Sequence, residues 1–283
     1  MSNFKSCAGV IVSASEKILI DTNMGQDETS ELLRAEQPDI AIMSHYHLDH
    51  CTWGPLVSEH TDAELFIPEG EERYLTSLDF FIEKTGGAAG LAREWTEFTL
   101  DVTGYREIRD FSTYPHGHQF LSDDVTIECV GTPGHSPSHT AFYFPKEKIL
   151  FTGDMGVDRF GPWYGWVDCD LRQVIASILK LRSLDVRVLL TSHGGVVTSG
   201  IEDAWNEGLR RITKREQRIR DQLEAGKGKE DIVDEGVFFR NKSRVPEPMR
   251  SFLFMWDKAM FDHHKALLEQ GGIGRYFPEL SHL

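Results

Sequence analysis

Six consecutive residues, His45-Tyr46-His47-Leu48-Asp49-His50, place three imidazoles and a carboxylate on one short segment. The apolar run 40–43 comes just before them and is bounded by Pro38-Asp39 and Ser44, a pattern typical of a buried strand. Side chains on the turn that leaves a buried strand converge on a small volume, and zinc readily binds imidazole nitrogen and carboxylate oxygen. The segment therefore predicts a metal site rather than a group of surface histidines.

Three later segments have the same arrangement, an apolar strand that ends in a potential metal ligand. The ligands are His135 after the run 125–130, Asp154 after 148–151 and His193 after 186–191. The ligands of sheet-based sites collect where strands give way to loops, and the neighbouring glycines allow a close approach of the backbone. A histidine after one strand is more often structural, but these three in this order indicate one shared site.

In this order the motifs resemble the signature of the metallo-β-lactamase superfamily, in a glyoxalase II-like form, over roughly residues 7–200. The resemblance implies an α/β fold, a four-layer αββα sandwich, with two divalent metal ions at one edge. Zinc is the expected metal, although iron and manganese suit the same ligands. By position, the implied ligands are His45, His47 and His135 for the first metal and Asp49, His50 and His193 for the second, with Asp154 as the bridge.

The resemblance also implies roles for residues that do not bind metal. Asp21 in Ile20-Asp21-Thr22 matches an early aspartate of the superfamily that orients the site, and His139 is expected to act in the same way. The implied reaction is attack of a metal-bridging hydroxide on an ester, thioester or lactone, with Asp154 bridging the metals and Asp49 handling a proton. Two alternatives stay open, a metal-dependent endoribonuclease and a metal-binding protein without catalysis.

Aromatic residues close to Asp154 bear on the substrate. Trp163, Tyr164 and Trp166 lie in a loop rich in glycine and proline, which predicts a pocket wall for an apolar acyl or ring group. The alternative is that they pack on the body of the protein. The helical stretch 70–100, with Phe80-Phe81-Ile82 and Trp95, is expected to cap the same pocket.

Near residue 200 the sequence pattern changes from short apolar runs to long, more polar stretches with helical spacing. We predict a catalytic domain over 1–200 and a helical, winged-helix-like domain over 201–283, with the boundary near 200–225. The second part resembles an appendage found in a subgroup of the superfamily that includes an endoribonuclease and thioesterases. The basic run from Arg210 to Arg220 predicts either a phosphate contact or a solvated helix face.

The net charge of -15 arises from residues 1–200, since residues 201–283 hold equal numbers of acidic and basic side chains. An acidic catalytic part repels polyphosphates, which favours a small-molecule substrate over nucleic acid.

The four cysteines form no C-x-x-C pair and are expected to be free thiols. No apolar run approaches the roughly 20 residues of a membrane helix, so a cytoplasmic protein without a membrane partner is expected. The sequence is compatible with either a monomer or a homodimer.

Short apolar runs predict strands, and apolar residues at helical spacing predict helices. Four further histidines match no ligand position: His116 and His118 are expected in a turn or at the pocket rim, and His263 and His264 in a structural role. The predicted strands are 8–13, 17–20, 39–44, 64–68, 125–130, 140–144, 148–151 and 186–191, and the predicted helices are 25–36, 53–58, 70–100 with a break at 86–87, 170–184, 201–224 and 247–270, with a short segment at 230–235.

Overall fold

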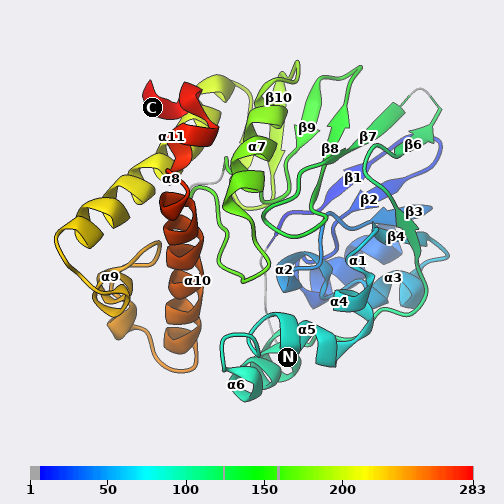
Figure 1. The fold of residues 1–283 in the computed structure, drawn as a ribbon. Helices are drawn as coiled ribbons and strands as arrows, with labels where there is room; N and C mark the ends of the chain where they lie inside the picture. The colour runs from blue at the N-terminus through cyan, green and yellow to red at the C-terminus, as the bar shows by residue number, and fades with distance from the viewer. Residues whose placement is uncertain (1–6, 124, 158–159, 283) are drawn as a thin grey trace.

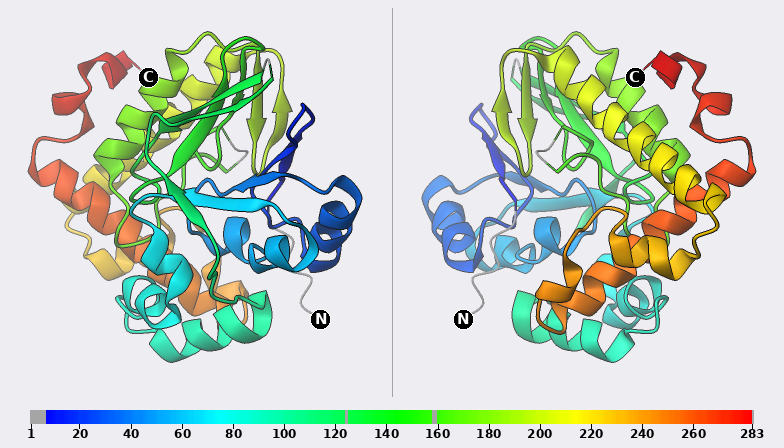
Figure 2. Two further views of the ribbon diagram at one scale, coloured as in Figure 1. Left: turned by 90° about the vertical axis from the view of Figure 1, so that its right-hand side faces the viewer. Right: turned by 90° about the vertical axis from the view of Figure 1, so that its left-hand side faces the viewer.

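The computed structural model describes residues 7–123, 125–157 and 160–282 and places two β-sheets against each other (Figures 1 and 2). In the first sheet, of order β1-β2-β3-β4-β5, β1 runs antiparallel to β2 and the other neighbours are parallel. The strands are β1 (Val10–Val12), β2 (Ile18–Ile20), β3 (Ile40–Ile42), β4 (Glu64–Pro68) and β5 (Ser112–Tyr114).

The second sheet has the order β11-β10-β9-β8-β7-β6, and β9 and β10 are its parallel pair. Because β8 is antiparallel to both β7 and β9, the carboxyl ends of β7, β9 and β10 meet at one edge of this sheet. The strands are β6 (Gln119–Ser122), β7 (Val125–Gly131), β8 (Thr140–Phe144), β9 (Ile149–Phe151), β10 (Val188–Thr191) and β11 (Gly195–Val197).

The two sheets share an apolar core. Ile18 and Ile20 of β2 pack there with Phe142 of β8 and Phe151 of β9, and all four side chains are fully buried. Leu19 points the opposite way, because successive side chains on a strand alternate between the faces of its sheet, and it is buried with the helices. Burial on both faces explains why these strands appear in the sequence as unbroken apolar runs.

Helices cover the outer faces of both sheets, α1 and α3 on the first and α7 on the second (Figure 2). This arrangement confirms the predicted four-layer α/β sandwich. A further group of short helices and one π-helical segment, η1, connects β4 to β5. The helices are α1 (Gln26–Glu36), α2 (Leu48–Cys51), α3 (Pro55–His60), α4 (Glu72–Thr76), α5 (Leu78–Lys84), α6 (Ala92–Glu97), η1 (Phe98–Thr103) and α7 (Leu171–Arg182).

The chain after residue 200 is helical and packs on the sandwich beside α7 (Figure 1). Trp205, Leu209 and Phe252 belong to the same buried cluster as residues of the sandwich. The described residues 201–282 contain helices and no strand, so the β-hairpin that forms the wing of a winged helix is absent from them. The helices are α8 (Ile201–Glu224), α9 (Lys229–Glu235), η2 (Lys242–Arg244), α10 (Met249–Glu269), α11 (Ile273–Tyr276) and η3 (Pro278–His282).

Most of the predicted elements are present, and the long helices α1, α7, α8 and α10 agree with their predicted ranges to within a few residues. The stretch 70–100 is instead three short helices followed by η1. Ser77, in an extended conformation, separates α4 from α5, and the Gly-rich segment 85–91 separates α5 from α6 over a longer span than expected. The first helix after the motif begins at Leu48, inside the motif, rather than at residue 53. Strands β5, β6 and β11 were missed, because none of them contains an apolar run longer than two residues. Among the described helices, none is long and apolar enough to cross a membrane.

Candidate metal centre and its pocket

The predicted metal ligands lie at the carboxyl ends of strands from both sheets. His45 to His50 follow β3 of the first sheet, and His135, Asp154 and His193 follow β7, β9 and β10 of the second. Strands that point the same way deliver the loops after them to one edge of the sandwich. All seven predicted ligands therefore come together, although they span about 150 residues of the chain.

Three histidines form the first part of the cluster. The ligand atoms of His45, His47 and His135 lie within 4.8 Å of one another, and the Nε2 atoms of His45 and His135 are 3.2 Å apart. Each of these two rings holds its Nδ1 proton in a hydrogen bond, from His135 to the carbonyl oxygen of Trp163 at 2.9 Å and from His45 to Ser44 Oγ at 2.9 Å. Two unprotonated Nε2 atoms then face each other, an arrangement that a shared cation stabilises.

The second part of the cluster contains Asp49, His50, Asp154 and His193, again with ligand atoms within 4.8 Å. Asp154 lies between the two parts, because Oδ1 is 3.1 Å from His50 Nε2 and Oδ2 is 3.5 Å from His135 Nε2. His193 Nε2 is 3.2 Å from Asp49 Oδ2 and 3.3 Å from Asp154 Oδ1. A carboxylate with one oxygen toward each group is the geometry of a bridging ligand.

The cluster fits two metal ions by the chemistry of its atoms. His47 Nε2, His50 Nε2 and Asp154 Oδ1 are buried and have no hydrogen-bond partner within the described structure. Buried polar atoms are nearly always paired, so three such atoms at one place indicate a bound group that completes them. Imidazole nitrogen and carboxylate oxygen are the ligands that zinc, iron and manganese accept.

The charges of the cluster also favour cations. Burial lowers the pKa of His193, but Asp154 and Asp49 outweigh this effect and raise the pKa to about 11. Burial acts to raise the pKa of Asp49, whereas His50 and His193 lower it to about 2. The two carboxylates thus remain ionised and attract positive charge to the space between them.

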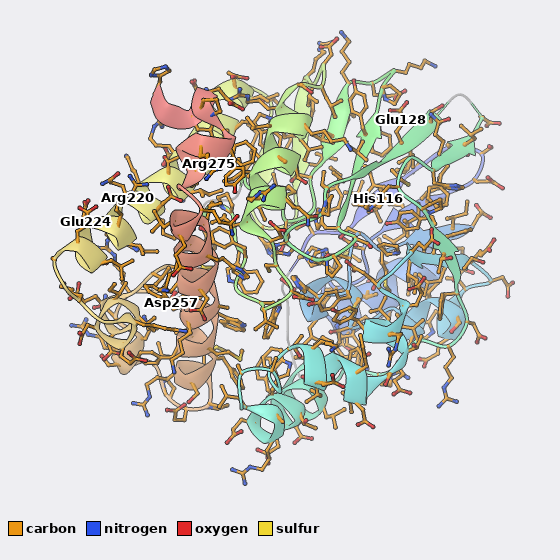
Figure 3. The ribbon with its side chains drawn as sticks, in the orientation of Figure 1. His116, Glu128, Arg220, Glu224, Asp257 and Arg275 are labelled. Carbon is orange, nitrogen blue, oxygen red and sulfur yellow. The ribbon has the colours of Figure 1, made fainter. Side chains whose placement is uncertain are left out.

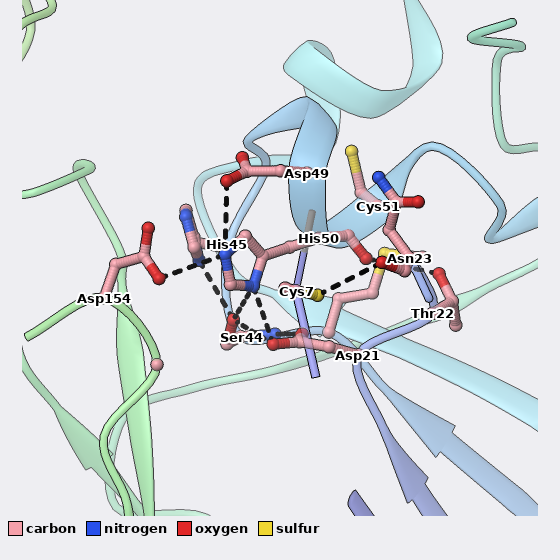
Figure 4. A network of polar contacts seen from close by, with 12 residues as sticks. Cys7, Asp21, Thr22, Asn23, Ser44, His45, Asp49, His50, Cys51 and Asp154 are labelled. Atoms are coloured by element: carbon pink, nitrogen blue, oxygen red, sulfur yellow. Dashed lines mark hydrogen bonds and ion pairs between the residues drawn. The ribbon is translucent and has the colours of Figure 1, made fainter. Parts of the chain in front are cut away.

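Asp21 holds one side of the cluster in place (Figure 4). Its fully buried carboxylate accepts hydrogen bonds from His50 Nδ1 at 2.8 Å, from the Ser44 backbone N–H at 2.7 Å and from Ser44 Oγ at 2.8 Å. The proton on His50 Nδ1 leaves Nε2 free to face Asp154. Asp21 therefore contacts a predicted ligand directly, and through Ser44 it also supports His45.

His139 supports the opposite side. Its Nδ1 donates to Thr132 Oγ1 at 2.8 Å, and its Nε2 accepts from the backbone N–H of Asp154 at 3.2 Å. The ring is fully buried, and burial is the main reason that its pKa lies well below the usual value. A neutral ring in this tautomer can accept the Asp154 N–H, so His139 positions the bridging carboxylate through its backbone.

A cavity of about 380 Å³ opens directly from the cluster. Four predicted ligands, His47, Asp49, Asp154 and His193, form one end. Nine aromatic side chains make up most of the remaining wall, and they come from three separate parts of the chain. They are Phe81, Trp95 and Phe98 from the helices after β4, Phe160, Trp163 and Trp166 from the loop after β9, and Phe238, Phe239 and Trp256 from the C-terminal part.

The sequence and the fold of this chain match those of known proteins. A family model of the metallo-β-lactamase superfamily matches residues 4–193. The chain belongs to the metallo-β-lactamase superfamily. A metallo-β-lactamase family protein from Thermus thermophilus has the same fold, with a TM-score of 0.73 at 20% identity over 94% of this chain and 89% of that one.

Two curated relatives are more similar in sequence. The atrochrysone carboxyl ACP thioesterase of Aspergillus fumigatus is 26% identical over 220 residues, which are 74% of this chain and 57% of that protein. The probable metallo-hydrolase YflN of Bacillus subtilis is 25% identical over 205 residues, 62% of this chain and 75% of that protein. This chain thus spans little more than half the length of the fungal relative.

Two of the three predicted pocket residues line the cavity, and the third does not. Trp163 and Trp166 are part of the wall, but Tyr164 is fully buried and points away from the cavity. The Tyr164 hydroxyl accepts a hydrogen bond from Arg215 of α8 and donates one to His264 Nε2 of α10 at 2.8 Å. Adjacent residues in a loop point to different sides, so the assignment of Tyr164 to the pocket was wrong.

The structure also shows the positions and contacts of the other predicted histidines and of the basic run. His116 and His118 lie in the turn between β5 and β6 and belong to neither part of the metal cluster; Figure 3 shows His116 there, and its Nε2 lies 3.2 Å from the Ser138 carbonyl oxygen. His263 donates to the carbonyl oxygen of Trp166 at 2.8 Å. The arginines of α8 contact groups of this chain: Arg210 and Arg211 contact Glu207, Arg215 contacts Tyr164, Arg218 contacts the 236–237 carbonyls and Arg220 contacts Glu216.

Glu71 is a buried acid that the sequence analysis missed. Its carboxylate accepts hydrogen bonds from the Tyr46 N–H at 2.6 Å, from Ser136 Oγ at 2.5 Å and from the Ser138 N–H at 2.8 Å. It therefore ties the turn after β3 to the turn after β7, the two turns that carry the first three ligands. Glu71 comes shortly after the apolar strand β4, as His135 and Asp154 come after theirs, but so does the exposed Glu69, so this position alone does not single out Glu71.

We expect Glu71→Gln to lower metal affinity about tenfold and stability by about 1–3 kcal/mol, because an amide NH2 replaces one of two accepting oxygens. Chelator competition and thermal unfolding measure these effects. Glu69→Gln is the matched control, since Glu69 is an exposed acid two residues away. Unchanged metal affinity and stability in Glu71→Gln would show that this carboxylate does not hold the ligand turns.

Proposed function

We propose that this protein is a metal-dependent hydrolase that cleaves an ester, thioester or lactone with a large apolar acyl group. The observation that carries the proposal is the single cavity that has the predicted metal ligands at one end and aromatic side chains around the rest. A carbonyl group held at the ligand end would leave its apolar substituent among the aromatic rings. Apolar walls with a few polar groups at one end are typical of sites for small molecules.

The size and chemistry of the cavity support an uncharged, apolar acyl group. Its volume of about 380 Å³ suits a group of one to a few rings or a short chain. Among the described residues that line it, none is lysine or arginine. Phosphate groups are bound mainly by such cations or by backbone N–H groups, so this wall favours an apolar group over a nucleotide.

The residues present fit two divalent metal ions. His45, His47 and His135 would hold one, Asp49, His50 and His193 the other, and Asp154 both. Bound there, the ions supply Lewis acidity toward the substrate carbonyl and lower the pKa of water. Asp49 lies at the cavity with 29% of its side chain exposed, and its low pKa keeps it ionised. It can accept the proton that the attacking water loses, and this proton then leaves with the departing thiol or alcohol.

The curated relatives support a thioester among these substrates. The Aspergillus fumigatus relative is named as a thioesterase acting on an acyl carrier protein, and the Bacillus subtilis relative as a probable metallo-hydrolase. No comparable observation favours the endoribonuclease alternative. The arginines of α8 that suggested it contact Glu207, Tyr164, Glu216 and backbone carbonyls of this chain.

Hydrolysis of 2-naphthoyl and acetyl thioesters of pantetheine, followed by the release of free thiol, tests the proposal. We expect the purified protein to contain up to two metal ions, to hydrolyse the naphthoyl thioester, and to lose at least about 100-fold in rate when a chelator removes the metal. Zinc, iron or manganese added back should restore the rate. Full activity after verified metal removal would overturn the proposal, as would cleavage of single-stranded RNA without hydrolysis of any ester, thioester or lactone.

A further inference from the structure

One side of the cavity is formed by the loop 236–241, which connects α9 to η2 and has no regular secondary structure. Phe238 and Phe239 of this loop line the cavity, and so does Trp256 of α10. The Phe239 and Trp256 rings lie 5.9 Å apart, and Trp256 in turn contacts Trp163 and Trp166 at 5.9 and 5.7 Å. The position of this loop therefore decides how far the aromatic wall stands from the metal end.

Asp257 holds the N–H groups of the loop. It lies on α10 and is fully buried (Figure 3). Oδ1 accepts from the backbone N–H groups of Phe238 and Phe239 at 2.8 and 3.1 Å, and Oδ2 accepts from that of Val237 at 3.1 Å. Three consecutive N–H groups on one carboxylate leave the loop little freedom to shift along α10.

Two basic residues hold the carbonyl groups of the same loop. Lys242 Nζ donates to Asp257 Oδ2 at 2.6 Å and to the Phe239 carbonyl oxygen at 3.1 Å, and its side chain is 1% exposed. Arg218 donates to the carbonyl oxygens of Gly236 and Val237. The backbone N–H groups of 236–239 and three of the four carbonyl oxygens, those of Gly236, Val237 and Phe239, thus have hydrogen-bond partners inside the protein, as buried backbone groups require.

The backbone path of the loop is equally restricted. Gly236 has a φ of 103°, a conformation that side chains with a Cβ rarely adopt, and a Cβ there would lie 2.3 Å from the Phe239 carbonyl oxygen. Burying the Lys242–Asp257 pair costs desolvation energy, and an apolar pair of similar volume is often as stable. Stability alone therefore does not account for this buried pair, whereas its contacts with the loop that carries the aromatic wall do.

We infer that Asp257 and Lys242 are positioning residues that set the distance between the Phe238-Phe239 wall and the metal end, and so make the site select large apolar acyl groups over small ones. The inference rests on the proposed function for its kinetic consequence. The position of the wall should also change the affinity for large apolar ligands, whether or not they are hydrolysed. Large acyl groups touch the wall and small ones do not, so loss of the Asp257 contacts affects only the former.

The first experiment compares Asp257→Asn with Asp262→Asn, which removes the charge of an exposed aspartate on the same helix. We expect Asp257→Asn to raise KM for the naphthoyl thioester at least about tenfold, with kcat nearly unchanged and with kcat/KM for the acetyl thioester within about twofold of wild type. Phe239→Ala should give the same selective loss, and Asp262→Asn none. An equal loss for both thioesters, or no loss in a folded variant, would overturn the inference.

The second experiment measures binding without catalysis. The uncharged ketone 2-acetonaphthone is expected to quench the fluorescence of the four cavity tryptophans. Its Kd should rise at least about tenfold in Asp257→Asn and stay unchanged in Asp262→Asn. Wild-type binding without hydrolysis would defeat the proposed function but leave the inference standing. An unchanged Kd in folded Asp257→Asn, or no binding by wild type, would defeat the inference itself.

A double variant covers the case in which Asp257→Asn fails to fold. Asp257→Leu combined with Lys242→Met replaces the buried pair by apolar side chains and leaves no unpaired charge. We expect this variant to fold, as measured by circular dichroism and metal content, and still to show the raised Kd. The three loop N–H groups have lost their acceptor in it. Wild-type selectivity in the folded double variant would show that the pair is merely structural.

Discussion

Asp154→Ala is expected to reduce kcat by about 10³-fold or more and to lower the metal content from two ions to one or none. Asp154 is the residue that reaches both parts of the cluster, with Oδ1 at 3.1 Å from His50 Nε2 and Oδ2 at 3.5 Å from His135 Nε2. Its removal leaves the two parts of the cluster without a bridging ligand. It also removes the negative charge that stabilises cations between the buried imidazoles. Thioester hydrolysis and metal analysis by mass spectrometry measure the two effects.

Asp62→Ala is the control for this experiment, because Asp62 is an exposed aspartate between α3 and β4. Asp154→Asn keeps one oxygen ligand and should retain more metal than Asp154→Ala. Asp154→Ala with wild-type rate and metal content would contradict the bridging role. A metal-binding protein without catalysis predicts instead that wild type binds metal tightly and that this substitution changes nothing but stability.

Asp21→Asn is expected to weaken metal binding by about 10–100-fold, the range found when a hydrogen-bond partner of a metal-bound histidine is lost. Asp21 Oδ2 accepts from both His50 Nδ1 and Ser44 Oγ, and an amide NH2 placed there cannot accept either bond. The backbone should tolerate the change, because Asp21 has a φ of 59° and asparagine adopts this conformation readily. Competition with a chromophoric chelator measures the affinity.

At saturating metal, we expect Asp21→Asn to recover most of its rate, which separates a positioning role from a catalytic one. Asp21→Ala should additionally lower the melting temperature, since alanine adopts a positive φ less readily than aspartate and leaves buried donors without an acceptor. Asp27→Asn, an exposed change on α1, is the control. Wild-type metal affinity in a folded Asp21→Asn would exclude the proposed support of His50.

The metal ligands could be predicted because each depends on a short stretch of sequence. His45, Asp154 and His193 each come a few residues after an apolar strand, and a strand followed by a polar turn is recognisable locally. Their meeting at one edge followed from the resemblance to the superfamily, which is now confirmed over residues 4–193. Glu71 shows the limit of this reasoning, since its role appears only when the turns after β3 and β7 lie side by side.

The pocket could be predicted only in part. Trp163 and Trp166 line the cavity beside the metal cluster, but Tyr164 points to α8 and α10 because Arg215 and His264 bind its hydroxyl. The wall formed by Phe238 and Phe239 of the loop 236–241 and Trp256 of α10 was not expected, since no local pattern marks aromatic residues in the C-terminal part as belonging to a site. The regular elements described after residue 200 are all helices, and no strand of a winged helix is described among them.

By itself, the sequence determined the α/β sandwich, most of its strands and helices, and the complete set of candidate metal ligands. The strands, the helices and the candidate ligands follow from apolar periodicity and from ligands adjacent to strand ends, which act over a few residues. The sandwich was implied by the resemblance to the superfamily. Only the tertiary structure decided the shape of the cavity and the residues that position its walls. Contacts such as Trp163 with Trp256 and Trp95 with Trp256 join segments that are far apart in the chain, and packing alone brings them together.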